Sequence, residues 1–382
     1  MQDTKQRTET NVASNMPDEV EVEFVANPHS HLREGEVVAP LIVKALEGGV
    51  NAIGPMPNTN AGLTTADRVT DYINRAKDIA ASLNSPLKFL PFVMLTEDTT
   101  EKQVAECTEA GIFDGKMYPY LRTTKSERGI QKWGAMIPVL KWCAKYGMKA
   151  HGHFEHPNAE YSDRDAEFMC LPVVEILLQE TGAYIVWEHG SDGRCVPYWK
   201  DLAQSGRFCL TLTAHHLVTN EDTARRDVRA ECKPTIKTER DRIALVELIT
   251  ENHPWVMAGA DDAPHNSTAK HVHEGQCACG AYTAPFLLQL YAHALEHLLV
   301  SQNGIDTFVC FTSRNARSLY GLPIGRQKIK LRSEKFTIPH AYAIGSWTVE
   351  PFWAGRTINW RIDPLHWDVP ATPEKLSVEM AR

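Results

Sequence analysis

The sequence lacks the features that would place the protein in a membrane or on a nucleic acid. No segment of its 382 residues approaches the roughly 18 consecutive apolar residues that a membrane-spanning helix needs. Acidic residues outnumber basic ones by 48 to 40, and the net charge of -8 does not fit the basic surface of a nucleic-acid binder. We therefore expect a protein whose partner is a small molecule, with no nucleic acid and no membrane.

The N-terminal segment also lacks the apolar stretch that a secretory signal contains. Residues 1–20 are polar and partly acidic, so we interpret them as a flexible tail rather than a signal or transit peptide. The nine cysteines are sparse and odd in number, which favours reduced thiols and a cytoplasmic location. Cys277 and Cys279 form a lone C-x-C. We interpret it as a plain loop, since only His271 and His273 lie near enough in sequence to complete a zinc site.

Short apolar runs alternate with segments of helical periodicity along most of the chain. The runs span residues 20–31, 50–58, 87–95, 112–118, 147–153, 183–189, 208–216 and 254–265. Continuous apolar strands separated by helices indicate a parallel sheet covered on both faces, and eight such units predict an α/β fold of the (β/α)₈ TIM-barrel type. The alternative is a doubly wound open sheet. It would usually carry a G-x-G-x-x-G turn after its first strand, and none follows here.

The barrel prediction also organises the chain into domains. Residues that end the first and the last run must meet around one pocket, which argues for one barrel rather than two or three separate domains. We expect the barrel over residues 21–335, and a C-terminal extension, residues 336–382, packed on it.

Metal-binding residue types stand at the ends of the predicted strands. His29 and His31 are two residues apart, so strand alternation sends both to one face. His151, His189 and Asp261 end later runs, and the carboxyl ends of all barrel strands meet on the catalytic face. Four imidazoles and a carboxylate exceed what a single zinc ion needs and suit two.

Lys116, in the fourth run, is an unexpected residue beside two metal ions, because its ammonium group would be repelled by them. Reaction of the amine with CO₂ would give a carbamate whose two oxygens could bridge the metals. The alternative is a lysine that reaches solvent or binds an anionic substrate.

Six motifs occur in the order found in dihydroorotases, the amidohydrolase-superfamily barrels of the pyrimidine pathway. They are His29-Ser30-His31 with Leu32-Arg33, Met56-Pro57-Asn58, Gly115-Lys116-Met117-Tyr118-Pro119, Ala150-His151-Gly152, Trp187-Glu188-His189, and Gly259-Ala260-Asp261-Asp262-Ala263-Pro264-His265. From about residue 24 to about residue 355 the chain resembles the shorter, bacterial-type class of this family.

The resemblance implies a binuclear zinc enzyme that interconverts N-carbamoyl-L-aspartate and L-dihydroorotate in de novo pyrimidine biosynthesis. It implies one zinc held by His29, His31, Asp261 and carbamylated Lys116, and a second held by His151, His189 and the same Lys116. Asp261 would also move the proton between water and the ring nitrogen. Substrate would be bound by Arg33, Asn58 and His265 at its α-carboxylate, by Thr123 and Thr124 of a closing loop, and by the backbone near Cys232 and Lys233. The family is often homodimeric, but the sequence shows no interface pattern.

Two positions depart from the family pattern, and two other functions stay open. His153 stands where a carboxylate is usual; it could support a ligand or replace His151, and the ungapped register to Asp163 favours His151. Asp262 stands where a hydroxyl is usual, and we expect a solvated loop acid. A hydantoinase or allantoinase type of cyclic-amide hydrolase would share the metals without the carboxylate binders. A non-catalytic assembly partner should have lost metal ligands, whereas all six positions are filled here.

Overall fold

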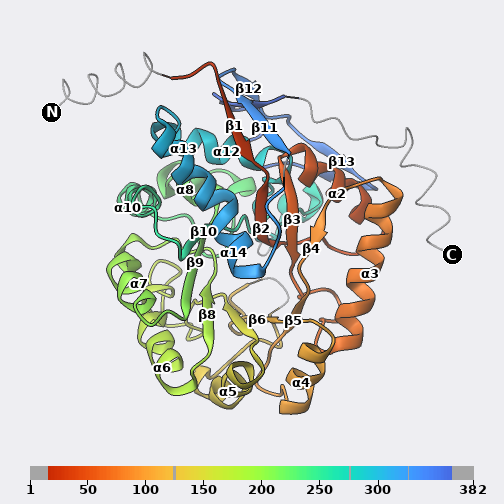
Figure 1. The fold of residues 1–382 in the computed structure, drawn as a ribbon, viewed down its shortest axis with the longest axis vertical. Helices are drawn as coiled ribbons and strands as arrows, with labels where there is room; N and C mark the ends of the chain where they lie inside the picture. Colours follow the sequence, from red (N-terminus) through yellow and green to blue (C-terminus); the bar gives the residue numbers. More distant parts are fainter. Residues whose placement is uncertain (1–15, 124–125, 275–276, 326, 364–382) are drawn as a thin grey trace.

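A ring of parallel strands forms the centre of the structure (Figure 1), a computed structural model that describes residues 16–123, 126–274, 277–325 and 327–363. Three strands pair in the order β2–β3–β4, and six pair in the order β10–β9–β8–β7–β6–β5. Their bounds are β2 Val25–Ser30, β3 Val50–Pro55, β4 Lys88–Phe89, β5 Phe92–Met94, β6 Asp114–Met117, β7 Lys149–Gly152, β8 Tyr184–Trp187, β9 Phe208–Leu212 and β10 Val256–Ala258.

Two seams join these sheets into one ring. Strands β4 and β5 are parts of a single run, divided at Leu90 and Pro91, where proline supplies no N–H for a ladder bond. At the other seam the Asp261 amide donates to the His29 carbonyl at 3.0 Å, and the His31 amide donates to the Asp262 carbonyl at 2.8 Å. The eight predicted runs therefore supply the eight positions of the ring, and the (β/α)₈ prediction is confirmed.

Helices cover the outside of the ring (Figure 1). In the longer helices the buried residues recur at helical spacing, as Leu41, Ile42 and Ala45 do in the first of them, so one apolar face packs on the strands. The helices are α2 Val38–Glu47, α3 Ala66–Ser82, α4 Glu101–Glu109, α5 Met136–Tyr146, α6 Leu171–Thr181, α7 Val196–Ala203, α8 Ala214–Val218, α9 Glu221–Ala224, α10 Glu239–Thr250, α11 Ser267–Lys270, α12 Leu287–Ala294, α13 Gln302–Val309 and α14 Asn315–Tyr320. None of the helices in the described part of the chain is long and apolar enough to cross a membrane.

The first predicted run, residues 20–31, is divided between two sheets. All six residues of β2 are buried in the ring, whereas β1 (Glu19–Glu23) alternates glutamate and valine and pairs antiparallel with β11 (Lys328–Arg332). An alternating strand has one wet face and suits a surface sheet, while a strand buried on both faces suits the barrel. We therefore correct the single strand predicted at residues 20–31 to two. Of the predicted tail, residues 1–15 lie outside the described residues.

The segment after the barrel forms small antiparallel pairs beside it. Strand β11 also pairs with β16 (Arg361–Ile362), β12 (Phe336–Thr337) pairs with β15 (Thr357–Ile358), and β13 (Tyr342–Ile344) pairs with β14 (Trp347–Val349). The boundary between barrel and extension at residue 335 stays a prediction, because the sheet β1–β11–β16 draws strands from both sides of it.

Candidate active site

Three predicted site residues have a backbone conformation that is rare for their residue types. Arg33, His189 and Asp261 have φ angles of 62°, 45° and 47°, in the left-handed region that non-glycine residues seldom adopt. Each of them follows the carboxyl end of a barrel strand. Such strain persists where the surrounding structure enforces it, and it concentrates at functional sites.

Asp261 joins His29, which lies in β2, to His31, which follows that strand. Its Oδ1 atom lies 3.0 Å from His29 Nε2 and 3.1 Å from His31 Nε2. Burial alone would raise the pKa of Asp261, but the charge and hydrogen bonds of these histidines hold it well below its usual value. Burial lowers the pKa of His31 to about 4, so its imidazole is neutral at pH 7 and can donate a lone pair to a metal.

His189 adds a second group of ligands that shares His29 with the first. The two imidazole ring centroids lie 5.1 Å apart, and the donor atoms of His29, Glu188 and His189 lie within 4.8 Å of one another, as do those of His29, His31 and Asp261. Within the described residues His189 Nδ1 has no hydrogen-bond partner although it is buried. An unsatisfied buried nitrogen is costly, and a metal ion would satisfy it.

The structure brings His153, not His151, beside His189. Strands β7 and β8 pair His151 with Val186 and Gly152 with Trp187, so His151 lies three residues below the level of His189. The His153 ring meets the His189 ring edge to face, with centroids 4.5 Å apart. Glu155 Oε2 lies 2.6 Å from His153 Nε2 and orients that ring.

His151 lies deeper in the barrel, where both of its nitrogens face carboxylates. Nε2 lies 3.0 Å from Asp114 Oδ1, and Nδ1 lies 3.2 Å from Glu188 Oε1. The ring is fully buried between Phe92 and Tyr320. A histidine engaged in this way fills the barrel interior rather than the pocket.

Lys116 points into the same interior and is fully buried. It forms an ion pair with Glu188, whose carboxylate also lies 3.2 Å from His29 Nδ1. Burial lowers the pKa of Lys116 to about 7, against the pull of Asp261 toward a higher value. Burial thus favours the neutral amine, the form that reacts with CO₂, whereas the ion pair with Glu188 favours the ammonium form.

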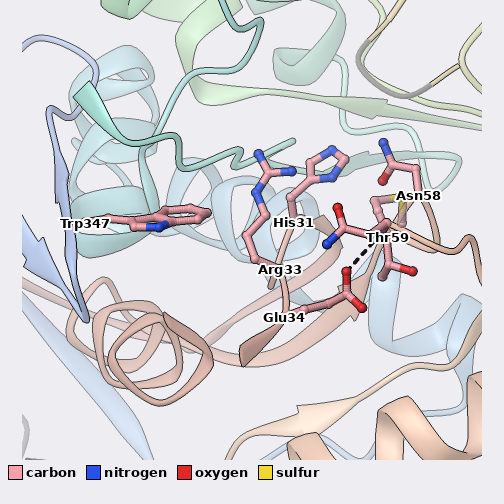
Figure 2. Close-up of a pocket in the computed structure, with 8 residues that line it drawn as sticks. His31, Arg33, Glu34, Asn58, Thr59 and Trp347 are labelled. Atoms are coloured by element: carbon pink, nitrogen blue, oxygen red, sulfur yellow. Dashed lines mark hydrogen bonds between the residues drawn. The ribbon is translucent and has the colours of Figure 1, made fainter. Parts of the chain in front are cut away.

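Arg33 and His265 meet beside this cluster. An Arg33 terminal nitrogen lies 3.1 Å from His265 Nε2, and Arg33 Nε donates to the Pro264 carbonyl at 3.0 Å. A cavity of about 140 Å³ opens here, lined by His31, Arg33, Glu34, Met56, Asn58, Thr59, Asn60 and Trp347 (Figure 2). Burial lowers the pKa of Arg33 to about 10, which still leaves it cationic at pH 7.

The structure gives less support to the remaining substrate-binding predictions. Thr123 lies in the loop after β6, where its amide donates to Ser126 Oγ at 3.2 Å, and Thr124 lies outside the described residues. The Lys233 ammonium pairs with the Asp163 carboxylate. None of these contacts connects Thr123 or Lys233 to the cavity beside Arg33.

Three residues near the site were missed or misjudged from the sequence. Glu188 received no role, because strand alternation sends it away from His189, and only the left-handed turn at His189 brings both to one cluster. Trp347 comes from the C-terminal extension and no motif marks it. Asp262 is buried rather than solvated, since it accepts hydrogen bonds from Ser30 Oγ at 3.0 Å and Asn27 Nδ2 at 3.3 Å.

Known proteins resemble this chain over most of its length, although no family model matches it. It is 31% identical over 343 residues to a dihydroorotase from Alkalilimnicola ehrlichii, which covers 87% of this chain and 96% of that relative. The crystal structure of a Saccharomyces cerevisiae dihydroorotase in complex with 5-fluoroorotic acid has a TM-score of 0.83 at 26% identity, covering 91% of this chain and 99% of the yeast chain. An L-hydantoinase from Arthrobacter aurescens has a TM-score of 0.74 at 14% identity over 88% of this chain and 82% of its own, a likeness of fold alone.

Proposed function

The chain belongs to the dihydroorotase family of metal-dependent cyclic amidohydrolases, and on that premise we propose that it interconverts N-carbamoyl-L-aspartate and L-dihydroorotate. The family membership agrees with the resemblance seen in the sequence motifs. The proposed place of the reaction is de novo pyrimidine biosynthesis, where the cyclisation direction would be used.

One observation carries the substrate proposal: a carboxylate-binding pair stands at the edge of the metal cluster. Arg33 and His265 are in contact, and Arg33 lines a cavity that also includes His31 and Asn58. A guanidinium fork matches a carboxylate in geometry and charge. Both N-carbamoyl-L-aspartate and dihydroorotate carry an α-carboxylate, and Asn58 would add an amide donor to it. Plain hydantoins have no such group.

The donor set around His29 fits two zinc ions. The two groups of ligands meet at His29, burial keeps the imidazoles neutral, and His189 Nδ1 lacks a partner among the described residues. We assign the two ions to one continuous cluster. Its members are His29, His31, Asp261, His189, carbamylated Lys116, and a histidine of the β7 end.

That β7 histidine is His153 in our proposal, which replaces His151 of the sequence interpretation. His153 lies against His189 and is oriented by the buried Glu155 carboxylate, as metal-bound histidines usually are. His151 already has a carboxylate at each ring nitrogen. It would have to break both of these contacts in order to reach a metal.

Carbamylation of Lys116 would remove the charge conflict inside the cluster. The neutral amine adds to the carbon of CO₂, the new N–C bond forms, and one proton leaves to water. The product carries two oxygens and a negative charge where the ammonium group stood. Glu188, which pairs with the ammonium group, would then be free to accept from His29 and His151.

The protein's own residues would carry out the following tasks in the reaction. Arg33, His265 and Asn58 bind the α-carboxylate and so fix the ring atoms against Asp261. In the hydrolytic direction Asp261 accepts the proton of the attacking water and delivers it to the ring nitrogen, and in cyclisation it does the reverse. A bound zinc pair would supply a water of lowered pKa and would polarise the carbonyl. Trp347 lines the cavity from the C-terminal extension.

A reversible cyclisation assay on metal-quantified protein tests the function. Formation of dihydroorotate from N-carbamoyl-L-aspartate, with loss of activity after chelation and recovery with Zn²⁺, is the expected result. Higher activity on unsubstituted hydantoin than on dihydroorotate would instead make the protein a hydantoinase-type hydrolase. Absence of both metal and activity would make it a non-catalytic partner.

We also propose a cytoplasmic location, because all nine cysteines, which lie in the described part of the chain, are free thiols. A homodimer stays a prediction.

A further inference from the structure

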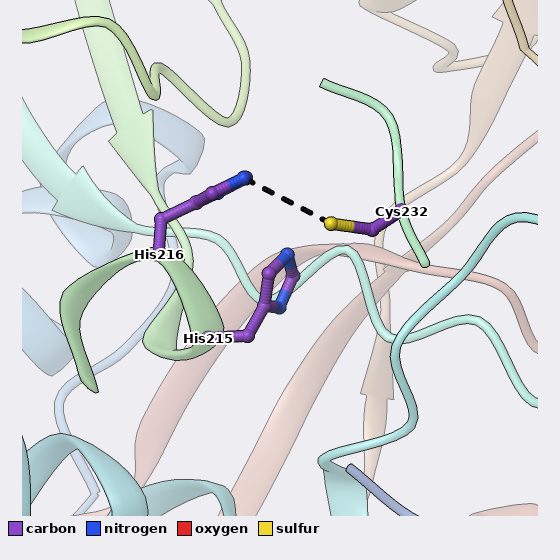
Figure 3. Close-up of side chains that lie close together, drawn as sticks. All are labelled: His215, His216 and Cys232. Carbon is purple, nitrogen blue, oxygen red and sulfur yellow. Dashed lines mark hydrogen bonds between the residues drawn. The ribbon is translucent and has the colours of Figure 1, made fainter. Parts of the chain in front are cut away.

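A second cluster of metal-ligand side chains shares no residue with the set around His29. The donor atoms of His215, His216 and Cys232 lie within 4.8 Å of one another, and all three side chains are buried (Figure 3). His215 and His216 belong to α8, directly after β9, and Cys232 comes from the loop that follows α9. The proposed reaction assigns no role to any of these three side chains.

His215 is the observation that points to a ligand. Neither of its ring nitrogens has a hydrogen-bond partner among the described residues, although the side chain is fully buried. Burial lowers the pKa of His215 to about 4, so the ring is neutral and each buried polar atom is costly while it stays unsatisfied. Figure 3 shows the ring directed toward the space between His216 and Cys232.

The other donors lie close to the spacing of a tetrahedral site. Cys232 Sγ lies 4.0 Å from His216 Nε2, and the carbonyl oxygen of Pro234 lies 3.0 Å from that nitrogen and 3.3 Å from the sulfur. Zinc bonds of about 2.0 Å to nitrogen and about 2.3 Å to sulfur require ligand separations of about 3.3–3.6 Å at the tetrahedral angle. Small side-chain movements would therefore bring all four donors to one ion.

The hydrogen bonds around His216 allow this exchange. In the metal-free form its Nε2–H and the Cys232 thiol can both donate to the Pro234 carbonyl. His216 Nδ1 lies 2.7 Å from Thr213 Oγ1. In the other tautomer the proton is on Nδ1, this N–H donates to Thr213 Oγ1, and the Nε2 lone pair is free for the metal.

We propose that His215, His216 and Cys232, with the Pro234 carbonyl oxygen, form a third metal site that takes one thiophilic divalent ion of the zinc type. Binding forms the metal–sulfur, metal–nitrogen and metal–oxygen bonds and releases one proton, that of the Cys232 thiol. Lys270 stands near the thiolate, since its Nζ donates to the carbonyl oxygen of the neighbouring Glu231 at 3.0 Å. Burial raises the pKa of the Cys232 thiol and the charge of Lys270 only opposes that shift, so the bound ion itself has to displace the thiol proton. The site follows from its own residues and does not depend on the proposed reaction.

Cobalt substitution tests the site independently of activity. The ligand groups around His29 contain only nitrogen and oxygen donors, so a thiolate-to-metal charge-transfer band in a Co²⁺ titration of the full-length protein reports a cysteine-ligated ion. We expect the intensity of this band to correspond to about one cysteine-ligated ion per chain, in addition to the ions of the His29 cluster. Cys232→Ser should abolish it and lower the bound metal by one ion per chain.

Two control variants distinguish this site from other thiols. Cys143→Ser, at a buried position of α5, should leave the band unchanged, and so should the double variant Cys277→Ser/Cys279→Ser. A band that survives Cys232→Ser, or that disappears with the C-x-C loop instead, would overturn the proposal, as would the absence of any thiolate band.

A further variant tests the site without removing the thiol, for the case in which Cys232→Ser does not fold. His215→Gln keeps the thiol and should weaken Co²⁺ binding at this site by at least about tenfold, with the band still reached at high Co²⁺. Unaltered affinity in His215→Gln would remove His215 from the site and refute the proposed ligand set.

Discussion

His153 and His189 lie edge to face with ring centroids 4.5 Å apart, at the carboxyl ends of two adjacent strands. His151, two residues earlier on the same strand, lies between the Asp114 and Glu188 carboxylates. The two histidines therefore differ in depth. His153 lies at the strand ends, where it is a candidate metal ligand, and His151 lies in the barrel interior.

Two glutamine variants should differ in metal content. His153→Gln should lose about one zinc per chain, because it removes a nitrogen next to His189. His151→Gln should retain both ions but lose about 1–3 kcal/mol of unfolding free energy, since two buried carboxylates lose a partner. Metal analysis and denaturant unfolding measure the two effects. The reverse pattern of metal loss would restore His151 as the ligand.

Asp261→Asn should lower turnover by at least about 100-fold, because the amide cannot accept and deliver a proton. Its oxygen can still contact His29 and His31, so metal content should stay largely intact. Steady-state assays on metal-quantified protein check this, and unchanged turnover would remove Asp261 from proton transfer.

Arg33→Lys should raise the KM for N-carbamoyl-L-aspartate sharply, at least about tenfold, because an ammonium group cannot replace a bidentate fork. Arg68 is the matched control. It is exposed and donates to the Ala61 and Gly62 carbonyls, so Arg68→Lys should leave KM unchanged. Equal KM values for the two variants would detach Arg33 from the substrate carboxylate.

Native mass spectrometry of metal-loaded protein should detect one added CO₂ per chain that acid removes. Lys116→Ala should lack this added mass and should bind less zinc. Lys149→Ala is the control, because the Nζ atom of Lys149 lies 3.1 Å from Asp114 at the base of the same region. This variant should keep the added mass. A free Lys116 amine in the metal-loaded protein would exclude the carbamate.

Glu23→Gln should lower the free energy of unfolding by about 1 kcal/mol at neutral pH. The Glu23 carboxylate accepts from Arg314 and Lys328, each at 3.0 Å. Burial alone would raise its pKa, but these hydrogen bonds hold it below 4.5. The ionised form is thus favoured in the folded state. Its stabilisation is full above the unfolded pKa and disappears as the pH falls through the lower folded value.

Denaturant midpoints of wild type and Glu23→Gln should accordingly converge in acid. The exposed Glu21, on the same strand, provides the control, and Glu21→Gln should have little effect at any pH. A stability difference for Glu23→Gln that persists unchanged in acid would contradict the ion-pair explanation.

The chain order of strands and helices could be read from the sequence because each element has its own local periodicity. The alternation of glutamate and valine over Glu19–Glu23 is also visible in the sequence, but β11, the strand that pairs with this segment, lies about 300 residues away in sequence. Only pairing with β11 separates β1 from the barrel strand β2.

The sequence by itself determined that His29, His31, His189 and Asp261 would stand at strand ends and therefore share one face of the barrel. The tertiary structure decided which of the neighbouring residues lie at the same height in the barrel. It placed His153 beside His189 and Glu188 within the ligand cluster, and it placed Trp347 of the C-terminal hairpin at the cavity. The physical reason is that strand register and backbone turns at strand ends depend on hydrogen bonds between distant segments, whereas residue periodicity is local.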